Sequence, residues 1–230
     1  MRDPATPEPA APDPAELFDN AVVTAVHAVP TDPTRVRILV NRKRAAEILL
    51  DDAERLAVRA GDAWTPELAD RVTQAAAECA AWRVALRLIR VRARSHAEIV
   101  RRLRQKAHDP AVASAVADRL VERGLIDDAN FAEQAARSVL SRRPAGARFV
   151  EAKLRERGLA PDLARAAARD AMADRDPRAD AIALAERALR TMPDSLAPEV
   201  LRRRVLARLA RRGFEPDDAA AALDHVLPRS

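Results

Sequence analysis

The sequence predicts a mainly α-helical protein: tandem three-helix repeats, helix-turn-helix-like, in a curved stack behind a small N-terminal β-hairpin region. The first observation is compositional, with 48% hydrophobic, 3% aromatic and 33% charged residues, and Ala, Leu and Arg prominent. The second is a recurring segment, which is LRQKAHDP at 103–110, LRERGLAP at 154–161 and LARRGFEP at 209–216. The copies start 51 and then 55 residues apart, which fits a unit of about three helices.

Each copy of the segment has the residue order of a helix, a tight turn and a second helix. A basic residue stands where the last turn of a helix favours positive charge, and Ala107, Gly158 or Gly213 follows it. Glycine there can take the left-handed conformation, and the proline three residues later suits the first turn of the next helix. The first copy departs from this pattern, with Ala107 in place of glycine. We expect structural turns at Ala107, Gly158 and Gly213, and another at Gly124, which ends its own helix.

The N-terminal third differs in composition. Residues 1–20 carry five prolines among Ala, Asp and Glu, which predicts a disordered tail. From Val22, the β-branched runs VVTAVHAV and RVRILV flank a Pro/Asp/Thr turn and predict a β-hairpin. The run at 45–50 fits either a third strand or the start of a helix. We expect a hairpin-plus-helix region at 21–78, then helical repeats at 79–126, 127–175 and 176–230.

Several polar residues have the positions of helix caps. Asp51 with Glu54 resembles a cap for a short helix that stops at Gly61, and Thr65 with Pro66 opens the next helix. A capping box is predicted at Ser95 and Glu98. The acidic residues at other expected helix starts are interpreted as caps and partners of the helix dipole rather than as catalytic groups. These are Asp109, Asp127, Asp128, Asp217 and Asp218.

Arginines gather on two predicted helix faces. One ridge lies between two apolar faces of the helix from Pro66 to about Arg92, and the other lies on the middle helix of the last repeat. Both ridges fit either a solvated face or a surface that meets a polyanion or an acidic protein, and the net charge of +5 favours such partners. The candidate partner-binding residues are Arg87, Arg90 and Arg94 on the first ridge and Arg204, Arg208 and Arg211 on the second.

Catalysis has little support in the sequence. There is no phosphate-binding glycine loop, no serine elbow, no Tyr and no cluster of His, Cys and carboxylates at ligand spacing, so we expect no catalytic residue, metal or cofactor. Cys79, the one cysteine, is interpreted as a small core residue. No apolar run is long enough for a membrane span and the N-terminus lacks a signal-peptide core, so we expect a cytoplasmic, monomeric protein.

Together these motifs resemble the RecX family of recombination regulators. The resemblance rests on the Ser95 and Glu98 box, the run LVERGLIDD at 120–128 followed by Phe131 and Ala132, and the turns at Gly158 and Gly213. It covers about residues 80–227. It implies tandem three-helix repeats that bind the nucleoprotein filament of the RecA recombinase. It also implies that the protein damps the ATPase, strand-exchange and coprotease activities of RecA, with roles in DNA repair, recombination and the SOS response.

A stand-alone DNA-binding protein is the alternative function. The helix, turn, helix pattern and the arginine ridges suit phosphates, as in helix-turn-helix proteins. However, the helix that begins at Pro161 is mostly Ala and does not carry the cluster of Asn, Gln and Arg side chains that is expected for reading bases. We therefore expect weak direct DNA binding with little sequence preference, beside RecA as the main partner.

Overall fold

The structure is a computed structural model that describes residues 21–193 and 195–227. The predicted disordered tail lies outside the described residues. Three strands are followed by ten helices in the described part of the chain. The chain divides into two compact units, which are described separately. The first unit holds the chain up to Val91 together with Val100–Arg119, and the second holds Arg92–Ile99 and the chain from Leu120 onward.

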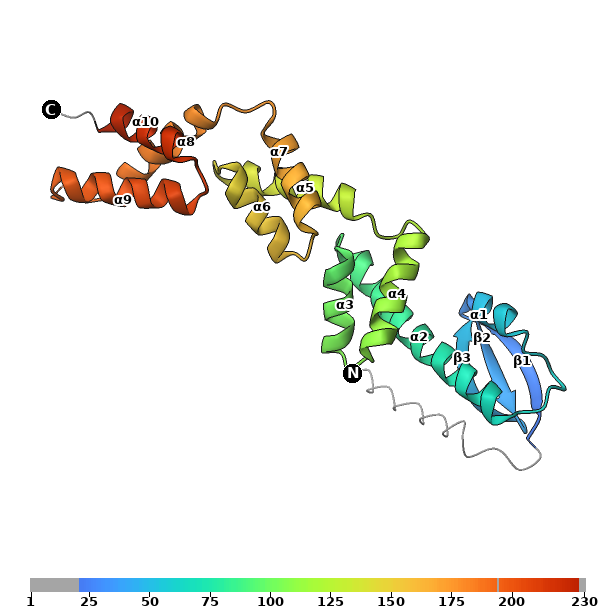
Figure 1. The fold of residues 1–230 in the computed structure, drawn as a ribbon. Helices are drawn as coiled ribbons and strands as arrows, with labels where there is room; N and C mark the ends of the chain where they lie inside the picture. The colour runs from blue at the N-terminus through green and yellow to red at the C-terminus, as the bar shows by residue number, and fades with distance from the viewer. Residues whose placement is uncertain (1–20, 194, 228–230) are drawn as a thin grey trace. The chain divides into compact units, whose positions relative to one another are not determined.

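The first unit begins with an antiparallel three-stranded sheet in the order β1, β2, β3 (Figure 1). Its strands are β1 (Val23–Val29), β2 (Asp32–Val40) and β3 (Lys43–Leu49). The predicted hairpin is confirmed, and the run with two interpretations forms strand β3. Asn41 and Arg42 join β2 to β3 with positive φ values of 48° and 65°, as a tight turn between twisted antiparallel strands requires.

Two helices, α1 (Leu50–Leu56) and α2 (Pro66–Val91), follow the sheet. Ile38, Val40 and Ile48 have no exposed surface, and with Val72 of α2 they belong to one hydrophobic cluster of the sheet and this helix. The alanine-containing segment of β3 packs against both the neighbouring strand and the helix, and this packing explains why it forms a strand. The predicted start of α2 is confirmed, because the Leu68 N–H donates to the Thr65 hydroxyl at 3.3 Å.

The predicted cap of α1 is wrong. Helix α1 starts one residue before Asp51, and its N-cap is Leu49, without a side-chain hydrogen bond. It ends at Leu56, with Ala57 as its C-cap, rather than at Gly61. The neighbouring Asp52 is only 1% exposed and lies 2.9 Å from the Arg119 guanidinium of α4 (Pro110–Glu122). The acidic residues that follow β3 therefore include a buried ion-pair partner, which the local pattern could not indicate.

Helical elements make up the rest of the described chain. They are α3 (His96–Gln105), α4, α5 (Asp128–Arg142), α6 (Ala147–Glu156), α7 (Pro161–Met172), α8 (Pro177–Leu189), α9 (Pro198–Arg211) and α10 (Pro216–Val226). Helices α5 to α7 share one hydrophobic core and helices α8 to α10 share another (Figure 1). We call these the α5–α7 bundle and the α8–α10 bundle. The predicted mainly helical class with tandem three-helix repeats is confirmed.

Besides α3, three of these helices begin with a side-chain cap. Asp109 accepts from the Ala111 N–H at 2.7 Å, Asp127 accepts from the Asn130 N–H at 2.9 Å, and Asp176 caps α8. Asp217 and Asp218 lie in the first turn of α10, which has no side-chain cap bond. The prediction that these two residues lie near the positive end of the helix dipole is confirmed, whereas the prediction that they cap the helix is wrong.

The four predicted turns all have the same geometry. Ala107, Gly124, Gly158 and Gly213 have φ values of 63°, 66°, 84° and 73°. In each turn the next residue donates its N–H to the carbonyl five positions back, as Leu159 does to Leu154 at 3.3 Å. This is the Schellman arrangement, which satisfies carbonyls that a helix end leaves without partners. Ala107 forms the turn in spite of its side chain.

Ala107→Gly is expected to stabilise the protein by up to about 1 kcal/mol. A side chain in the left-handed region costs about 1–2 kcal/mol, and relief of this strain exceeds the entropy that glycine adds to the unfolded chain. Urea denaturation followed by circular dichroism measures the change. Ala115→Gly, at an exposed position in the middle of α4, is the matched control and should destabilise by about 0.5–1 kcal/mol. Equal destabilisation by both variants would contradict the proposed strain.

Candidate functional site

The first predicted arginine ridge is shorter than expected. Arg87 and Arg90 are exposed on α2, and no described carboxylate pairs with either. Helix α2 ends at Val91, so Arg94 lies beyond it. The Arg94 side chain is 9% exposed and pairs with Glu98 of α3. The expectation that Arg94 projects from the ridge is therefore wrong, because a buried carboxylate holds its guanidinium.

Glu98 and Ser95 organise the start of α3 within the second unit. The Glu98 N–H donates to the Ser95 hydroxyl at 3.2 Å, which confirms one half of the predicted capping box. The Glu98 carboxylate accepts hydrogen bonds from Arg92 and Arg94. Burial opposes ionisation of this carboxyl, but the two arginines outweigh burial and lower its pKa. These arginines therefore have a structural role.

Two hydrogen bonds join the start of α3 to distant parts of the second unit. The Ser95 hydroxyl donates to the Arg157 carbonyl at 2.6 Å, and the Asp128 carboxylate accepts from the His96 N–H at 2.9 Å. Asp128 thus caps α3, although it is the first residue of α5. This confirms a capping role for Asp128 but places it on a different helix from the one the sequence indicated.

The second predicted ridge lies on α9. Arg204 and Arg211 are exposed, and no described carboxylate pairs with them. Arg208 is half-buried, and its Nη1 lies 3.4 Å from the Thr191 hydroxyl. The nearby Arg202 turns to α10, where it pairs with Asp224. The exposed arginines of α2 and α9 are available to a partner, and their partner-binding role stays a prediction.

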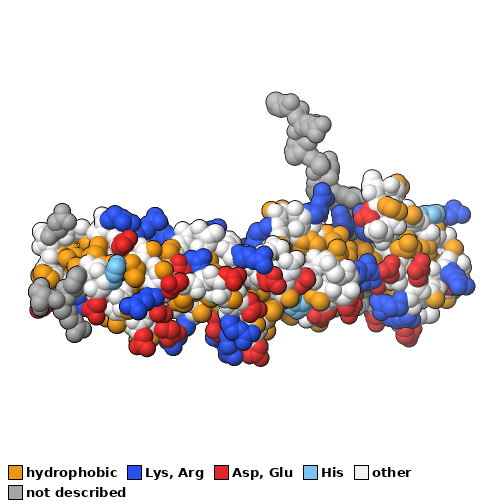
Figure 2. All heavy atoms as spheres, turned by 90° about the horizontal axis from the view of Figure 1, so that it is seen from above, with side chains coloured by type: hydrophobic (Ala, Val, Ile, Leu, Met, Phe, Trp, Pro, Cys, Tyr) orange, Lys and Arg blue, Asp and Glu red, His pale blue; other side chains and the backbone are white. Residues whose placement is uncertain are grey.

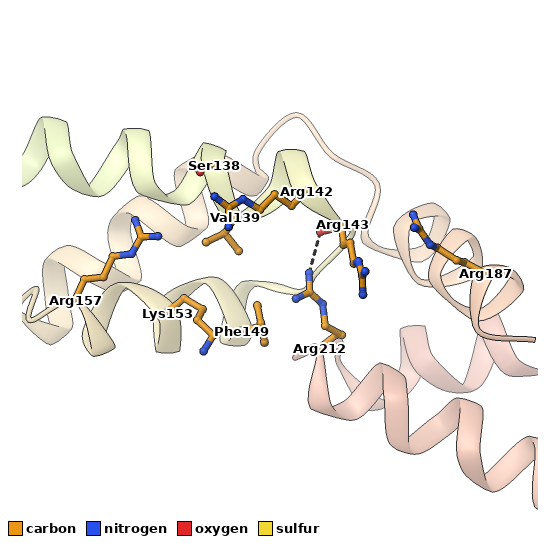
Figure 3. A pocket seen from close by; sticks show the side chains of 9 residues that line it. All are labelled: Ser138, Val139, Arg142, Arg143, Phe149, Lys153, Arg157, Arg187 and Arg212. Atoms are coloured by element: carbon orange, nitrogen blue, oxygen red, sulfur yellow. Dashed lines mark hydrogen bonds between the residues drawn. The ribbon is translucent and has the colours of Figure 1, made fainter. Parts of the chain in front are cut away.

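A basic pocket that the sequence did not reveal lies between the α5–α7 bundle and the α8–α10 bundle. Its volume is about 640 Å³ (Figure 3). Six cationic side chains line it, and none of its described lining residues is a carboxylate. The lining residues are Ser138, Val139, Arg142, Arg143, Phe149, Lys153, Arg157, Arg187 and Arg212. On the molecular face in Figure 2, Lys and Arg are interspersed with Asp and Glu.

Arg212 joins the two sides of this pocket. Its guanidinium donates to the carbonyls of Arg143 and Pro144 at 2.9 Å and lies 4.0 Å from the centre of the Phe149 ring (Figure 3). Burial, together with the positive charge of Arg143, lowers the pKa of the Arg212 guanidinium. The Arg212 carbonyl in turn accepts from the Gly146 N–H at 2.9 Å.

The recurring segment contains part of the signal for this pocket. Arg157 and Arg212 are its basic residues, and their local pattern indicates only partners of the helix dipole. The pair Arg142 and Arg143 before Pro144 indicates only a helix end. These residues come from two bundles and face one space only in the folded chain, so the sequence pattern alone does not indicate the pocket.

Two kinds of site can be checked directly in the described residues, a cysteine nucleophile and a metal cluster. Cys79 is 2% exposed, and burial raises the pKa of its thiol to about 11, so it is unsuited to act as a nucleophile. No group of three or more metal-ligating side chains occurs in the described part of the chain. Among the described helices, none has the length and apolarity that crossing a membrane requires.

The repeated three-helix units define a helical-repeat protein. Family models named for the first, second and third three-helix domains of RecX match residues 81–120, 127–167 and 176–223. The chain belongs to the RecX family of regulatory proteins. The exact repeat boundaries expected from the sequence stay predictions.

Individual relatives agree with this assignment. The chain is 36% identical to regulatory protein RecX of Mycobacterium sp. (strain JLS) over 167 residues, which are 68% of this chain and 82% of the relative. It is 37% identical to that of Mycolicibacterium smegmatis over 141 residues, 57% of this chain and 71% of the relative.

Solved structures have the same fold at low sequence identity. A crystal structure of regulatory protein RecX matches with a TM-score of 0.71 at 18% identity, over 89% of this chain and 99% of that one. RecX from Lactobacillus salivarius matches with a TM-score of 0.53 at 19% identity, over 65% and 96%.

Proposed function

We propose that this protein binds RecA and its filament on single-stranded DNA and inhibits the ATPase, strand-exchange and coprotease activities of RecA. Three consecutive RecX domains in one chain are the observation that carries the proposal. Under it, the protein acts in the cytoplasm as a monomer and takes part in DNA repair, recombination and the SOS response. It acts by binding rather than by catalysis, as the name of its relatives, regulatory protein, suggests.

The exposed arginines of α2 and α9 are the proposed contact residues. Arg87, Arg90, Arg204 and Arg211 hold their charges at the surface without a described carboxylate partner. Such charges can meet acidic protein surface or DNA phosphates without first breaking an internal ion pair. Arg94 leaves this set, because it pairs with Glu98 inside the second unit. Arg208 stays in the proposal as a half-buried edge of the α9 face.

Charge reversal on these helices is expected to weaken binding to RecA filaments by about tenfold or more, which corresponds to about 1.4 kcal/mol. The variants are Arg87→Glu with Arg90→Glu, and Arg204→Glu with Arg211→Glu. Folding should change little, because exposed charges contribute at most about 1 kcal/mol each. Filament binding and the RecA ATPase rate on single-stranded DNA are measured over a salt series, and the difference should shrink as salt rises.

A charge-matched variant controls for net charge. Arg165→Glu with Arg169→Glu makes the same change on α7, where both side chains are largely exposed. It should bind as the wild type does. Equal binding by all three variants would move the contact surface away from α2 and α9. An unchanged RecA ATPase rate with wild-type protein in severalfold excess would refute the function itself.

A further inference from the structure

The basic pocket gathers cations from two bundles. Arg142 and Arg143 stand at the end of α5, and Lys153 and Arg157 stand on α6 and just after it. Across the pocket, Arg187 belongs to α8, and Arg212 follows α9. Figure 3 shows these side chains around one space, with the Arg212 guanidinium between Phe149 and Arg143. The fold therefore brings like charges together from distant parts of the sequence.

Five of these six charges have no carboxylate partner within the described chain. Of the six cations, Lys153 alone pairs with a described carboxylate, that of Glu156 at 2.7 Å. Arg212 donates to carbonyl oxygens, which carry only partial charge. Like charges in one concave space repel each other and concentrate positive potential there. An anion with several charges would relieve this repulsion.

The chemistry of the lining favours phosphates over a base or a small organic molecule. Small-molecule sites usually carry only a few convergent polar groups, whereas six of the nine lining residues here are cationic. The described lining holds no Asn or Gln to read adenine and no Asp or Glu to read cytosine. Arg212 already covers one face of the Phe149 ring, on which a base could otherwise stack. Arginine forks suit phosphate oxygens, which they can bind with two parallel hydrogen bonds.

We propose that the basic pocket binds the phosphate groups of a single-stranded nucleic acid, and that the bound strand clamps the α5–α7 bundle to the α8–α10 bundle. A flexible single strand can bend its backbone into a concave space of about 640 Å³, whereas bending the stiff backbone of a duplex costs free energy. Contacts confined to phosphates make the binding independent of base sequence. The inference goes beyond RecA regulation and does not require RecA.

The test uses the full chain and fluorescence anisotropy of a labelled oligothymidylate of about 20 nucleotides, enough to span a typical single-strand site. Arg142→Glu with Arg187→Glu removes one exposed cation from each bundle, and Arg165→Glu with Arg169→Glu on α7 is the charge-matched control. The pocket variant should bind about tenfold or more weakly, which corresponds to about 1.4 kcal/mol. The control should bind as the wild type does.

Salt dependence gives a second readout. The slope of log binding constant against log salt should be smaller in the pocket variant by about 0.7 for each phosphate that the pocket no longer binds. Amide hydrogen exchange tests the clamp: the Gly146 N–H, which donates to the Arg212 carbonyl, should exchange more slowly when the strand is bound. Unchanged exchange at Gly146 would overturn the clamp.

Competition distinguishes the source of the phosphates. Unlabelled strand should displace the probe, whereas a duplex of equal length, ATP and inorganic phosphate should compete much less. Displacement by ATP or phosphate at the same concentration as the strand would overturn the assignment to a strand. Equal binding by wild type and pocket variant would overturn the site. The assay contains no RecA, so these outcomes are independent of the proposed function.

Discussion

Gly213→Val is expected to destabilise the second unit by about 4 kcal/mol or more, at the upper end of single-substitution effects. Gly213 has a φ of 73°, a conformation that strains any β-branched side chain. A Cβ at this position would also lie 2.4 Å from the backbone nitrogen of Phe149 and 2.9 Å from its Cβ. Neither atom belongs to a flexible side-chain end, so the two bundles would have to separate.

Gly124→Val is the matched control for this prediction. Gly124 has a φ of 66°, and no described atom outside its immediate neighbours lies within 4 Å of the position that a Cβ would take. The substitution should therefore cost only the backbone strain, about 1–3 kcal/mol. Thermal unfolding followed by circular dichroism compares the two variants with the wild type. Similar melting temperatures for both variants would show that glycine is needed at position 213 only for its positive φ. The backbone near Phe149 could then move to make room for a side chain.

Asp52→Ala is expected to destabilise the first unit by about 3 kcal/mol. Removing one partner of a buried ion pair leaves the other charge uncompensated, which costs about 3–5 kcal/mol. Asp52 is 1% exposed, and the Arg119 side chain is 20% exposed. Asp51 is a weaker substitute, because its carboxylate lies 3.7 Å from the Arg119 guanidinium. The Trp82 ring, 5.9 Å from the guanidinium, contributes less.

Asp51→Ala provides the comparison at the adjacent position. The Asp51 side chain is 57% exposed, so its ion pair with Arg119 is screened by water. Its removal should cost at most about 1 kcal/mol. Chemical denaturation of both variants measures the difference. Equal losses would mean that burial does not strengthen the Asp52 pair, and that other contacts fix α1 to α4.

Local features of this fold could be predicted from sequence because a few neighbouring residues determine them. The turn at Gly158, the cap at Asp109 and the hairpin from Val22 each depend on residues within a few positions. The predicted cap at Asp51 is wrong, since α1 already starts at Leu50. The buried ion pair of the neighbouring Asp52 with Arg119, 67 residues away, was not predicted either. Nothing in the local pattern identifies such a partner.

The candidate site was predictable to a smaller extent. The sequence pattern puts Arg87 and Arg204 on exposed helix faces, and both are exposed. It could not show that Arg94 pairs with Glu98, since α2 stops at Val91 instead of continuing to carry Arg94 on the ridge. It also could not show the basic pocket, where Arg212 meets the carbonyl of Arg143, 69 residues away.

The hydrogen bond from Gly146 to Arg212 uses only main-chain atoms. A Cβ on Gly146 would lie 2.0 Å from the Gly213 oxygen, so the approach of the two bundles depends on missing side chains on both segments. Substitutions of exposed side chains elsewhere on the surface can therefore change its charge and its preference for partners, while the distance between the two bundles stays the same. For protein engineering, Gly146 and Gly213 are therefore positions to keep when the side chains around them are changed.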